Sequence, residues 1–157
     1  MADNILPDKL NEILRSNANR IAKAAQITET IGSSGGYRWV GLYDVDLTRA
    51  LVSNIAWSGP AAPAYPTFPT TQGLTSKAIA QKQTINVGDV SADPNYLTAL
   101  DTTRSEIILP IHDQSGKVIG TLDVESEKPN AFDPASQALL EECARVLVGY
   151  FIEHSHN

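Results

Sequence analysis

Two apolar segments separated by one short turn constrain the fold of this chain most strongly. Residues 105–112 read SEIILPIH, residues 117–125 read KVIGTLDVE, and Asp113-Gln114-Ser115-Gly116 lies between them. Segments of this length that are rich in β-branched residues and bounded by turn-forming residues are typical of β-strands. Because so short a connection joins antiparallel neighbours, the sequence predicts a hairpin whose apolar residues must be covered by other elements.

A second pair of strands is expected earlier in the chain. Residues 37–46 read YRWVGLYDVD, and residues 50–57 read ALVSNIAW after a turn at Asp46-Leu47-Thr48. Aromatic and β-branched residues favour strands, so these segments predict another hairpin. A further short strand is expected at Thr84–Val87.

Amphipathic helices are expected near both ends. In residues 7–31 apolar side chains recur at three- and four-residue spacing, and the Gly- and Ser-rich segment 32–36 ends this pattern. Asp133 and Pro134 are a favourable N-cap and first helical residue, and an apolar stripe follows them in residues 134–154. A short helix is also expected at residues 74–81.

Two long connections complete the pattern. Residues 58–73 hold four of the nine prolines, and residues 88–103 are rich in turn-forming residues. Prolines exclude a central strand, and connections of this length are often functional. We therefore expect an α+β fold: a mostly antiparallel sheet with the terminal helices on one face and the long loops over the other. The chain is expected to be one domain over residues 1–157, with a core at 37–130.

Composition excludes several classes of function. The net charge is −6, the pI is near 4.9, and the basic residues are scattered, whereas nucleic acids and anionic membranes bind concentrated basic surfaces. One cysteine, Cys143, permits no intrachain disulfide. The amino-terminal segment lacks the pattern of a signal peptide, and no 18-residue apolar run occurs. We expect a cytoplasmic protein that binds neither nucleic acid nor membrane.

Three acids stand within or at the ends of the apolar strands. Strand alternation places Glu106 on the face of Ile108 and Pro110. The other two acids are expected to share a face with Ile119 and Thr121, opposite Val118, Gly120, Leu122 and Val124; these acids are Asp123 and Glu125. A buried charge needs a partner, which is either a ligand cation or a group of the protein, such as Arg104 or a loop amide. A glutamate at a strand end is also often solvated.

Aromatic side chains in or beside the long loops leave a similar choice. They either roof a pocket or pin the loops to the sheet; they are Trp57, Tyr65, Phe68 and Tyr96. The three histidines show no metal-ligand spacing, so no metal site is expected. Neither a phosphate-binding loop nor a nucleophile elbow is present.

Taken in order, several of these segments resemble the GAF domain family over residues 20–150. The resemblance is carried by Trp39-Val40-Gly41-Leu42-Tyr43, by Gly73 before the short helix, by Ser105-Glu106-Ile107-Ile108-Leu109-Pro110-Ile111, and by Gly120-Thr121-Leu122-Asp123-Val124-Glu125-Ser126 followed by Phe132-Asp133. With Trp57-Ser58-Gly59-Pro60 added, the chain looks most like the free-methionine-(R)-sulfoxide reductases of this family. This resemblance implies a small closed pocket over the sheet, in which acids hold the ammonium group of the substrate and assist proton transfer. The matching lining residues are Trp57, Tyr65, Glu106, Asp123 and Glu125.

The chain departs from this resemblance at the residues that carry the chemistry. The resemblance places reductase cysteines at two positions that are occupied here by Thr75 and Ala99. Thiol-dependent sulfoxide reduction needs a thiolate that attacks sulfur and a second thiol that resolves the intermediate. The remaining cysteine, Cys143, lies on the apolar stripe of the last helix and is expected to pack in the core.

These observations favour a stand-alone GAF domain that binds or senses a small amine-bearing metabolite without catalysis. One alternative is a reductase-like enzyme with altered chemistry. Another is a dimeric interaction module whose pocket has collapsed. No cofactor is expected, because bilin attachment would need a suitably placed cysteine. The expected partners are a small ligand, a second copy bound through the terminal helices, and a separate effector protein.

Overall fold

An antiparallel sheet organises the computed structural model, which describes residues 5–93 and 99–154. Within those residues the sheet has six strands in the order β3-β2-β1-β6-β5-β4. All adjacent strands are antiparallel. The strands are β1 (Trp39–Asp46), β2 (Leu51–Ser58), β3 (Thr67–Pro69), β4 (Ile85–Val87), β5 (Ser105–His112) and β6 (Val118–Ser126).

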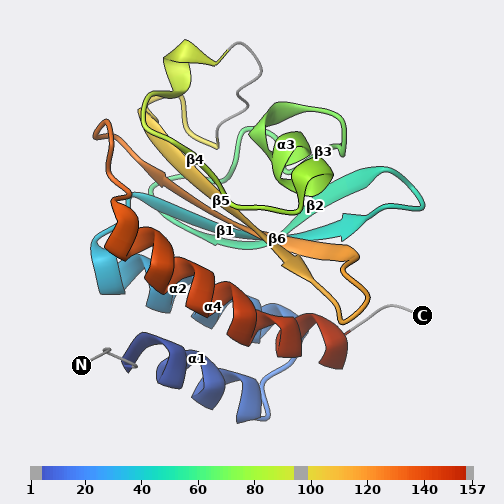
Figure 1. Ribbon diagram of the computed structural model, residues 1–157. Coiled ribbons are helices and arrows are strands. Elements are labelled where there is room, and N and C mark those ends of the chain that lie inside the picture. Colours follow the sequence, from blue (N-terminus) through green and yellow to red (C-terminus); the bar gives the residue numbers. More distant parts are fainter. Residues whose placement is uncertain (1–4, 94–98, 155–157) are drawn as a thin grey trace.

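Helices cover the sheet unequally (Figure 1). The helices are α1 (Ile5–Arg15), α2 (Arg20–Gly35), α3 (Gly73–Gln81) and α4 (Pro134–Glu153), with a 3₁₀ turn η1 at Val90–Ala92. Helices α2 and α4 lie on one face of the sheet, and α1 packs on their outer side. Helix α3 and the long connections lie over the opposite face, so the predicted α+β architecture is confirmed.

The amino-terminal helix was predicted wrongly as one continuous element. Helix α1 ends at Arg15 and α2 begins at Arg20. The Ser16 side chain donates a hydrogen bond to the Ile13 carbonyl oxygen at 2.7 Å, and Asn19 accepts one from the Ala22 amide at 2.9 Å. Short polar side chains of this kind compete with helical hydrogen bonds and favour caps, so they end one helix and start another.

The carboxyl end of α2 also differs from the prediction. The helix runs on through the segment 32–36 to Gly35, and Gly36 adopts a left-handed φ of 64°. In that conformation the Gly36 amide donates to the Gly32 carbonyl oxygen, which is a favourable way to end a helix.

The main core lies between the sheet and the helices. Its residues come from the inward faces of α1, α2 and α4 and from alternate positions of β1, β5 and β6; the most buried include Leu10, Ile27, Ile31, Val40, Leu42, Ile107, Leu109, Leu122, Val124, Leu140, Cys143 and Leu147. In the described part of the chain, no helix combines the length and hydropathy needed to cross a bilayer.

A β-bulge in β6 places Val118 and Ile119 on the faces of the sheet opposite to those predicted. Ile111 pairs with Gly120, but His112 pairs with Val118, so Ile119 is an extra residue opposite this step. Val118 therefore packs with the aromatic cluster on the loop face, whereas Ile119 packs against the helix-side core. The expectation that Ile119 shares the face of Thr121 was wrong because strand alternation does not continue through a bulge.

Candidate functional site

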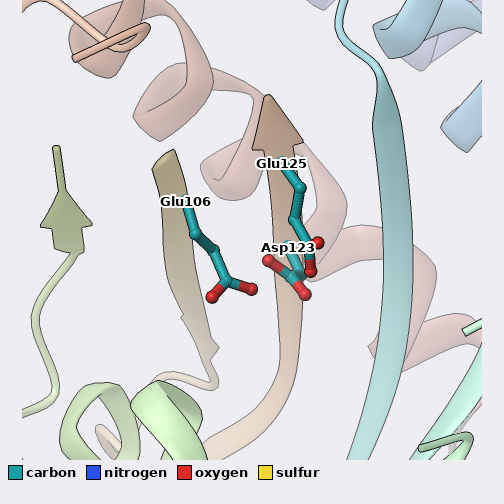
Figure 2. A group of neighbouring side chains, drawn as sticks. All are labelled: Glu106, Asp123 and Glu125. Carbon is teal, nitrogen blue, oxygen red and sulfur yellow. The ribbon is translucent and has the colours of Figure 1, made fainter. Parts of the chain in front are cut away.

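The three acids meet on the loop face of the sheet. Glu106 lies on β5 directly opposite Glu125 of β6, and Asp123 lies opposite Ile108. Asp123 and Glu125 point the same way because they are two residues apart on one strand. Figure 2 shows the three side chains converging between the two strands. One carboxylate oxygen from each lies within 4.8 Å of the others.

Glu125 has protein partners for both of its oxygens. Its Oε2 accepts a hydrogen bond from the Ala99 amide at 2.8 Å. Its Oε1 accepts one from the Thr103 hydroxyl at 2.5 Å and a longer one from the Leu100 amide at 3.4 Å. Glu125 is completely buried, so the prediction that a strand-end glutamate is often solvated does not hold here. It fastens residues 99–103 to the sheet.

Glu106 is buried without such partners. Its side chain is 1% exposed, and within residues 5–93 and 99–154 neither carboxylate oxygen has a hydrogen-bond partner. Burial raises the pKa of Glu106 well above its usual range, and the nearby charges of Asp123 and Glu125 raise it further. The predicted alternative of a loop amide or Arg104 as its partner is therefore not found in the described structure.

Asp123 is in a similar position. It is 6% exposed, and its Oδ1 has no hydrogen-bond partner among the described residues. Burial raises its pKa well above the usual range, and the charge of Glu125 adds to this. Three carboxyl groups so close together cannot all remain ionised in a buried site unless a cation joins them.

The aromatic residues closest to the acids along the sheet come from β1, and sequence reasoning missed them as site residues. Trp39 pairs with Glu125, and Gly41 pairs with Asp123. The Trp39 ring lies over Gly41, and its Nε1 donates to the Ala61 carbonyl oxygen at 3.1 Å. Tyr43 is buried two residues further on, and burial followed by the charge of Asp123 raises the pKa of its hydroxyl. The sequence signal that could have identified Trp39 and Tyr43 is their spacing, because each stands two residues from Gly41 on the same strand.

The predicted aromatic ligand residues are more open. Trp57 pairs with Gly41, which places it in the same cross-strand row as Asp123, but its side chain is 38% exposed. Tyr65 lies in the loop before β3 and is 49% exposed. Phe68 is buried in the aromatic cluster on this face, and Tyr96 lies outside the described residues.

The long loops meet over the acid face. The Ala64 amide donates to the Ala99 carbonyl oxygen at 3.0 Å, so the connection before β3 contacts the connection before β5. Ala99 and Leu100 then pack in the same cluster as Trp39 and Tyr43. Two surface hollows of the described residues lie away from the acids: one of about 390 Å³ beside α4 and β5, the other of about 720 Å³ near the β1–β2 turn. The acid cluster is enclosed rather than open to solvent, because none of its three side chains is more than 6% exposed.

The only cysteine of the chain lies on the other side of the sheet. Cys143 is fully buried in the helix-side core, as predicted, and burial raises its pKa to about 12. On the acid side, Thr75 occupies the first turn of α3 and is almost buried, while Ala99 offers its backbone amide to Glu125. The thiol and the acids are therefore separated by the sheet.

Comparison with known proteins identifies the family. The family model described as "GAF domain" matches residues 18–147. "GAF domain-containing protein A" of Dictyostelium discoideum is 32% identical over 145 residues, which are 92% of this chain and 89% of that protein. The free methionine-R-sulfoxide reductase of Saccharomyces cerevisiae is 29% identical over 111 residues, 69% of this chain and 60% of that protein.

Solved structures agree with this assignment. The structure of free methionine-R-sulfoxide reductase from Neisseria meningitidis, in complex with its substrate, has a TM-score of 0.84 at 28% identity, covering 97% of this chain and 92% of that one. The corresponding protein of Staphylococcus aureus, also in complex with substrate, has a TM-score of 0.79 at 21% identity, with 94% of each chain covered, which supports the fold alone. The chain belongs to the GAF domain family, and its homologues include free methionine-R-sulfoxide reductases.

Proposed function

We propose that this GAF domain binds a small metabolite that carries an ammonium group, and that Glu106, Asp123 and Glu125 recognise that group without catalysing a reaction. The observation that carries the proposal is the state of Glu106, whose buried oxygens lack hydrogen-bond partners among the described residues. An unpaired buried carboxylate is costly, so a cation that donates hydrogen bonds to it would be stabilised there.

The similarity to the Neisseria meningitidis reductase suggests the class of ligand. That protein is named for free methionine-R-sulfoxide, and its structure contains the substrate. A free amino acid carries an α-ammonium group with three N–H donors, which suits a cluster of three carboxyl groups. Free methionine-(R)-sulfoxide is therefore the first ligand to test.

The absence of cysteines at the two reductase positions supports ligand binding rather than sulfoxide reduction. Thr75 and Ala99 stand where the resemblance places the reductase cysteines. A hydroxyl and a methyl group cannot form the sulfur intermediates of that chemistry. Cys143 is buried beyond the sheet with a pKa of about 12, so its thiolate is scarce at neutral pH. The role that remains is that of a sensor, which would pass its signal to a separate protein.

Calorimetric titration with free methionine-(R)-sulfoxide tests the proposal. We expect saturable binding to the wild-type chain and a loss of about tenfold or more in Glu106→Gln and Asp123→Asn, since a hydrogen bond to a charged group contributes roughly 1.5–3 kcal/mol. Asp113→Asn is the matched control, because Asp113 lies in the β5–β6 connection, where its carboxylate accepts hydrogen bonds from Ser115 and Lys117. Equal affinity in all four proteins would refute the assignment of the acids.

An assay of thiol-dependent turnover separates this proposal from the enzyme alternative. We expect no reduction of free methionine-(R)-sulfoxide above the protein-free rate. Turnover that persists in Cys143→Ser would contradict the account of the missing thiols, because that variant contains no cysteine.

The enclosed geometry favours a second candidate, an interaction module whose pocket is filled by its own loops. Glu125 already has three protein donors, and Ala64 is hydrogen-bonded to Ala99 across the pocket. If amino acids with a free ammonium group release no heat and give no thermal stabilisation, this candidate replaces the first.

A further inference from the structure

We propose that the cluster of Glu106, Asp123 and Glu125 also binds a hard divalent cation of the Ca²⁺ or Mn²⁺ class. The inference rests on the acid cluster of the proposed function but not on the identity of the amine. Its geometric basis is the convergence of one oxygen from each acid to within 4.8 Å of the others, in the arrangement that Figure 2 shows. Sequence spacing gave no sign of this site, because the three ligands come from two strands that meet only in the fold.

The charge of the cluster favours a divalent over a monovalent cation. When ionised, the three carboxylates carry three negative charges, and within the described residues no lysine, arginine or histidine forms a salt bridge with them. An ammonium group would leave two charges to be neutralised by protons, whereas a divalent cation leaves one. Because uncompensated charge in a buried site is costly, the cluster should bind a divalent cation more favourably than a monovalent one.

The second observation is that several oxygens in this region have no partner. Both oxygens of Glu106 and Oδ1 of Asp123 lack hydrogen bonds although these residues are 1% and 6% exposed. Thr121 lies two residues before Asp123 on β6, is 1% exposed, and its hydroxyl also lacks a partner in the described structure. By strand alternation it lies on the face of Asp123, so a further unpaired oxygen belongs to the side of the sheet that carries the cluster.

The donor set selects the kind of metal. Carboxylate and hydroxyl oxygens, with no nitrogen or sulfur ligand, suit Mg²⁺, Ca²⁺ and Mn²⁺ rather than Zn²⁺ or Cu²⁺. Mg²⁺ usually keeps several of its waters, and an enclosed cluster leaves little room for them. Ca²⁺ accepts six to eight oxygens, including both oxygens of one carboxylate, so three carboxylates can supply most of its ligands.

Binding of Mn²⁺ to the metal-free chain tests the proposal. After treatment with a chelator and its removal, electron paramagnetic resonance measures free Mn²⁺ during a titration, and Ca²⁺ is added as a competitor. We expect one saturable site per chain that Ca²⁺ displaces, with affinity reduced at least tenfold in Glu106→Gln. Glu29→Gln is the matched control, because Glu29 is an exposed glutamate on α2, on the helix side of the sheet.

Three results would overturn the proposal: no saturable Mn²⁺ binding, equal binding in Glu106→Gln, or an equal loss in Glu29→Gln. Asp123→Asn provides a second cluster variant if Glu106→Gln does not give a cooperative thermal transition.

The amine titration, repeated in chelator, separates this inference from the proposed function. Amine binding without metal binding would overturn the metal site alone. Metal binding without amine binding would support the metal site and refute amine recognition. Mutual competition would support both, because it places the two cations in the same cluster.

Discussion

Glu106 and Glu125 face each other across β5 and β6, yet their surroundings differ. Glu125 receives hydrogen bonds from Ala99, Leu100 and Thr103, whereas Glu106 receives none from the described residues. The same residue type thus has two roles at one cross-strand pair. Glu125 positions a loop, and Glu106 is left with unfulfilled bonding capacity that a ligand or a proton can satisfy.

This difference predicts how stability depends on pH. Burial raises the pKa of both Glu106 and Asp123; the charges of Asp123 and Glu125 raise that of Glu106 further, and the charge of Glu125 raises that of Asp123. Groups whose pKa is higher in the folded state stabilise the fold below their unfolded pKa, about 4, and this stabilisation is lost as the pH rises through the folded pKa. In chelator, Glu106→Gln should therefore gain stability over the wild type increasingly as the pH rises above about 4.

Urea unfolding between pH 3 and 8 measures this gain. Asp113→Asn should behave in the opposite way, because the Ser115 hydroxyl lowers the pKa of Asp113 and that contribution is lost as the pH falls. A constant difference between Glu106→Gln and the wild type at every pH would contradict the raised pKa of Glu106.

At the scale of elements, β1 brings the aromatic residues to the site. Gly41 leaves the space that the Trp39 ring fills, since a Cβ at position 41 would lie 2.2 Å from Cη2 of Trp39. The indole is held in turn by its bond to the Ala61 carbonyl oxygen. Because Gly41 has no side chain, β1 can hold the Trp39 ring on the face of the sheet that carries the acids.

Gly41→Ala should lower the free energy of unfolding by about 1–3 kcal/mol, the usual range for overpacking. Gly149→Ala is the contrasting variant, because its nearest neighbour, Leu14 Cδ1, would be 3.6 Å away and alanine favours a helix by about 0.5–1 kcal/mol. Denaturant unfolding should thus show changes of opposite sign. If Gly41→Ala were as stable as the wild type, the Trp39 ring would not be held tightly over Gly41.

The junction of α1 and α2 gives a second prediction at this scale. Because Asn19 accepts a hydrogen bond from the Ala22 amide, Asn19→Ala should lower stability by about 1 kcal/mol. Asn17→Ala, an exposed change in the same junction, should alter it by less than about 0.5 kcal/mol. Thermal unfolding of the two variants compares them directly, and equal losses would contradict the capping role of Asn19.

Elements with a long and regular pattern were predicted best from the sequence. Strand β5 has the predicted bounds, and α4 ends one residue before the predicted end. The break at Ser16–Asn19 was missed because a cap depends on one or two side chains, which a longer apolar period conceals. The bulge at Ile119 was missed because it depends on pairing with β5 rather than on β6 alone.

The candidate site was predicted only in part, because it also depends on contacts between segments far apart in the sequence. Alternation placed Asp123 and Glu125 on one face, and the family resemblance added Glu106, but Glu125 is covered by residues 99–103, which bond to it across 22 to 26 positions of sequence. The covering of an acid by a distant loop depends on tertiary contacts, which strand periodicity does not reveal. Trp39 and Tyr43 were overlooked because aromatic residues in a strand are typical of any core.

At the scale of the whole molecule, α1 and α4 leave apolar side chains exposed. Ile5 is 61% exposed near the start of α1, and Ile152 is 53% exposed near the end of α4. We propose a homodimer through these helices. Static light scattering should give twice the chain mass of 16.9 kDa, and Ile5→Asp combined with Ile152→Asp should give the single mass. A single mass for the wild type at every concentration would refute the dimer.

The position of Cys143 makes the chain its own reporter of unfolding. It is the only thiol, it is fully buried in the helix-side core, and its pKa of about 12 suppresses the reactive thiolate. A thiol-specific chromophore should therefore label the native chain only when the core opens, and the labelling rate then follows the population of opened molecules. Adding an amino acid or Mn²⁺ should slow that labelling to the extent that it binds the folded form, so one thiol with no part in ligand recognition becomes a kinetic assay for every ligand of the acid site.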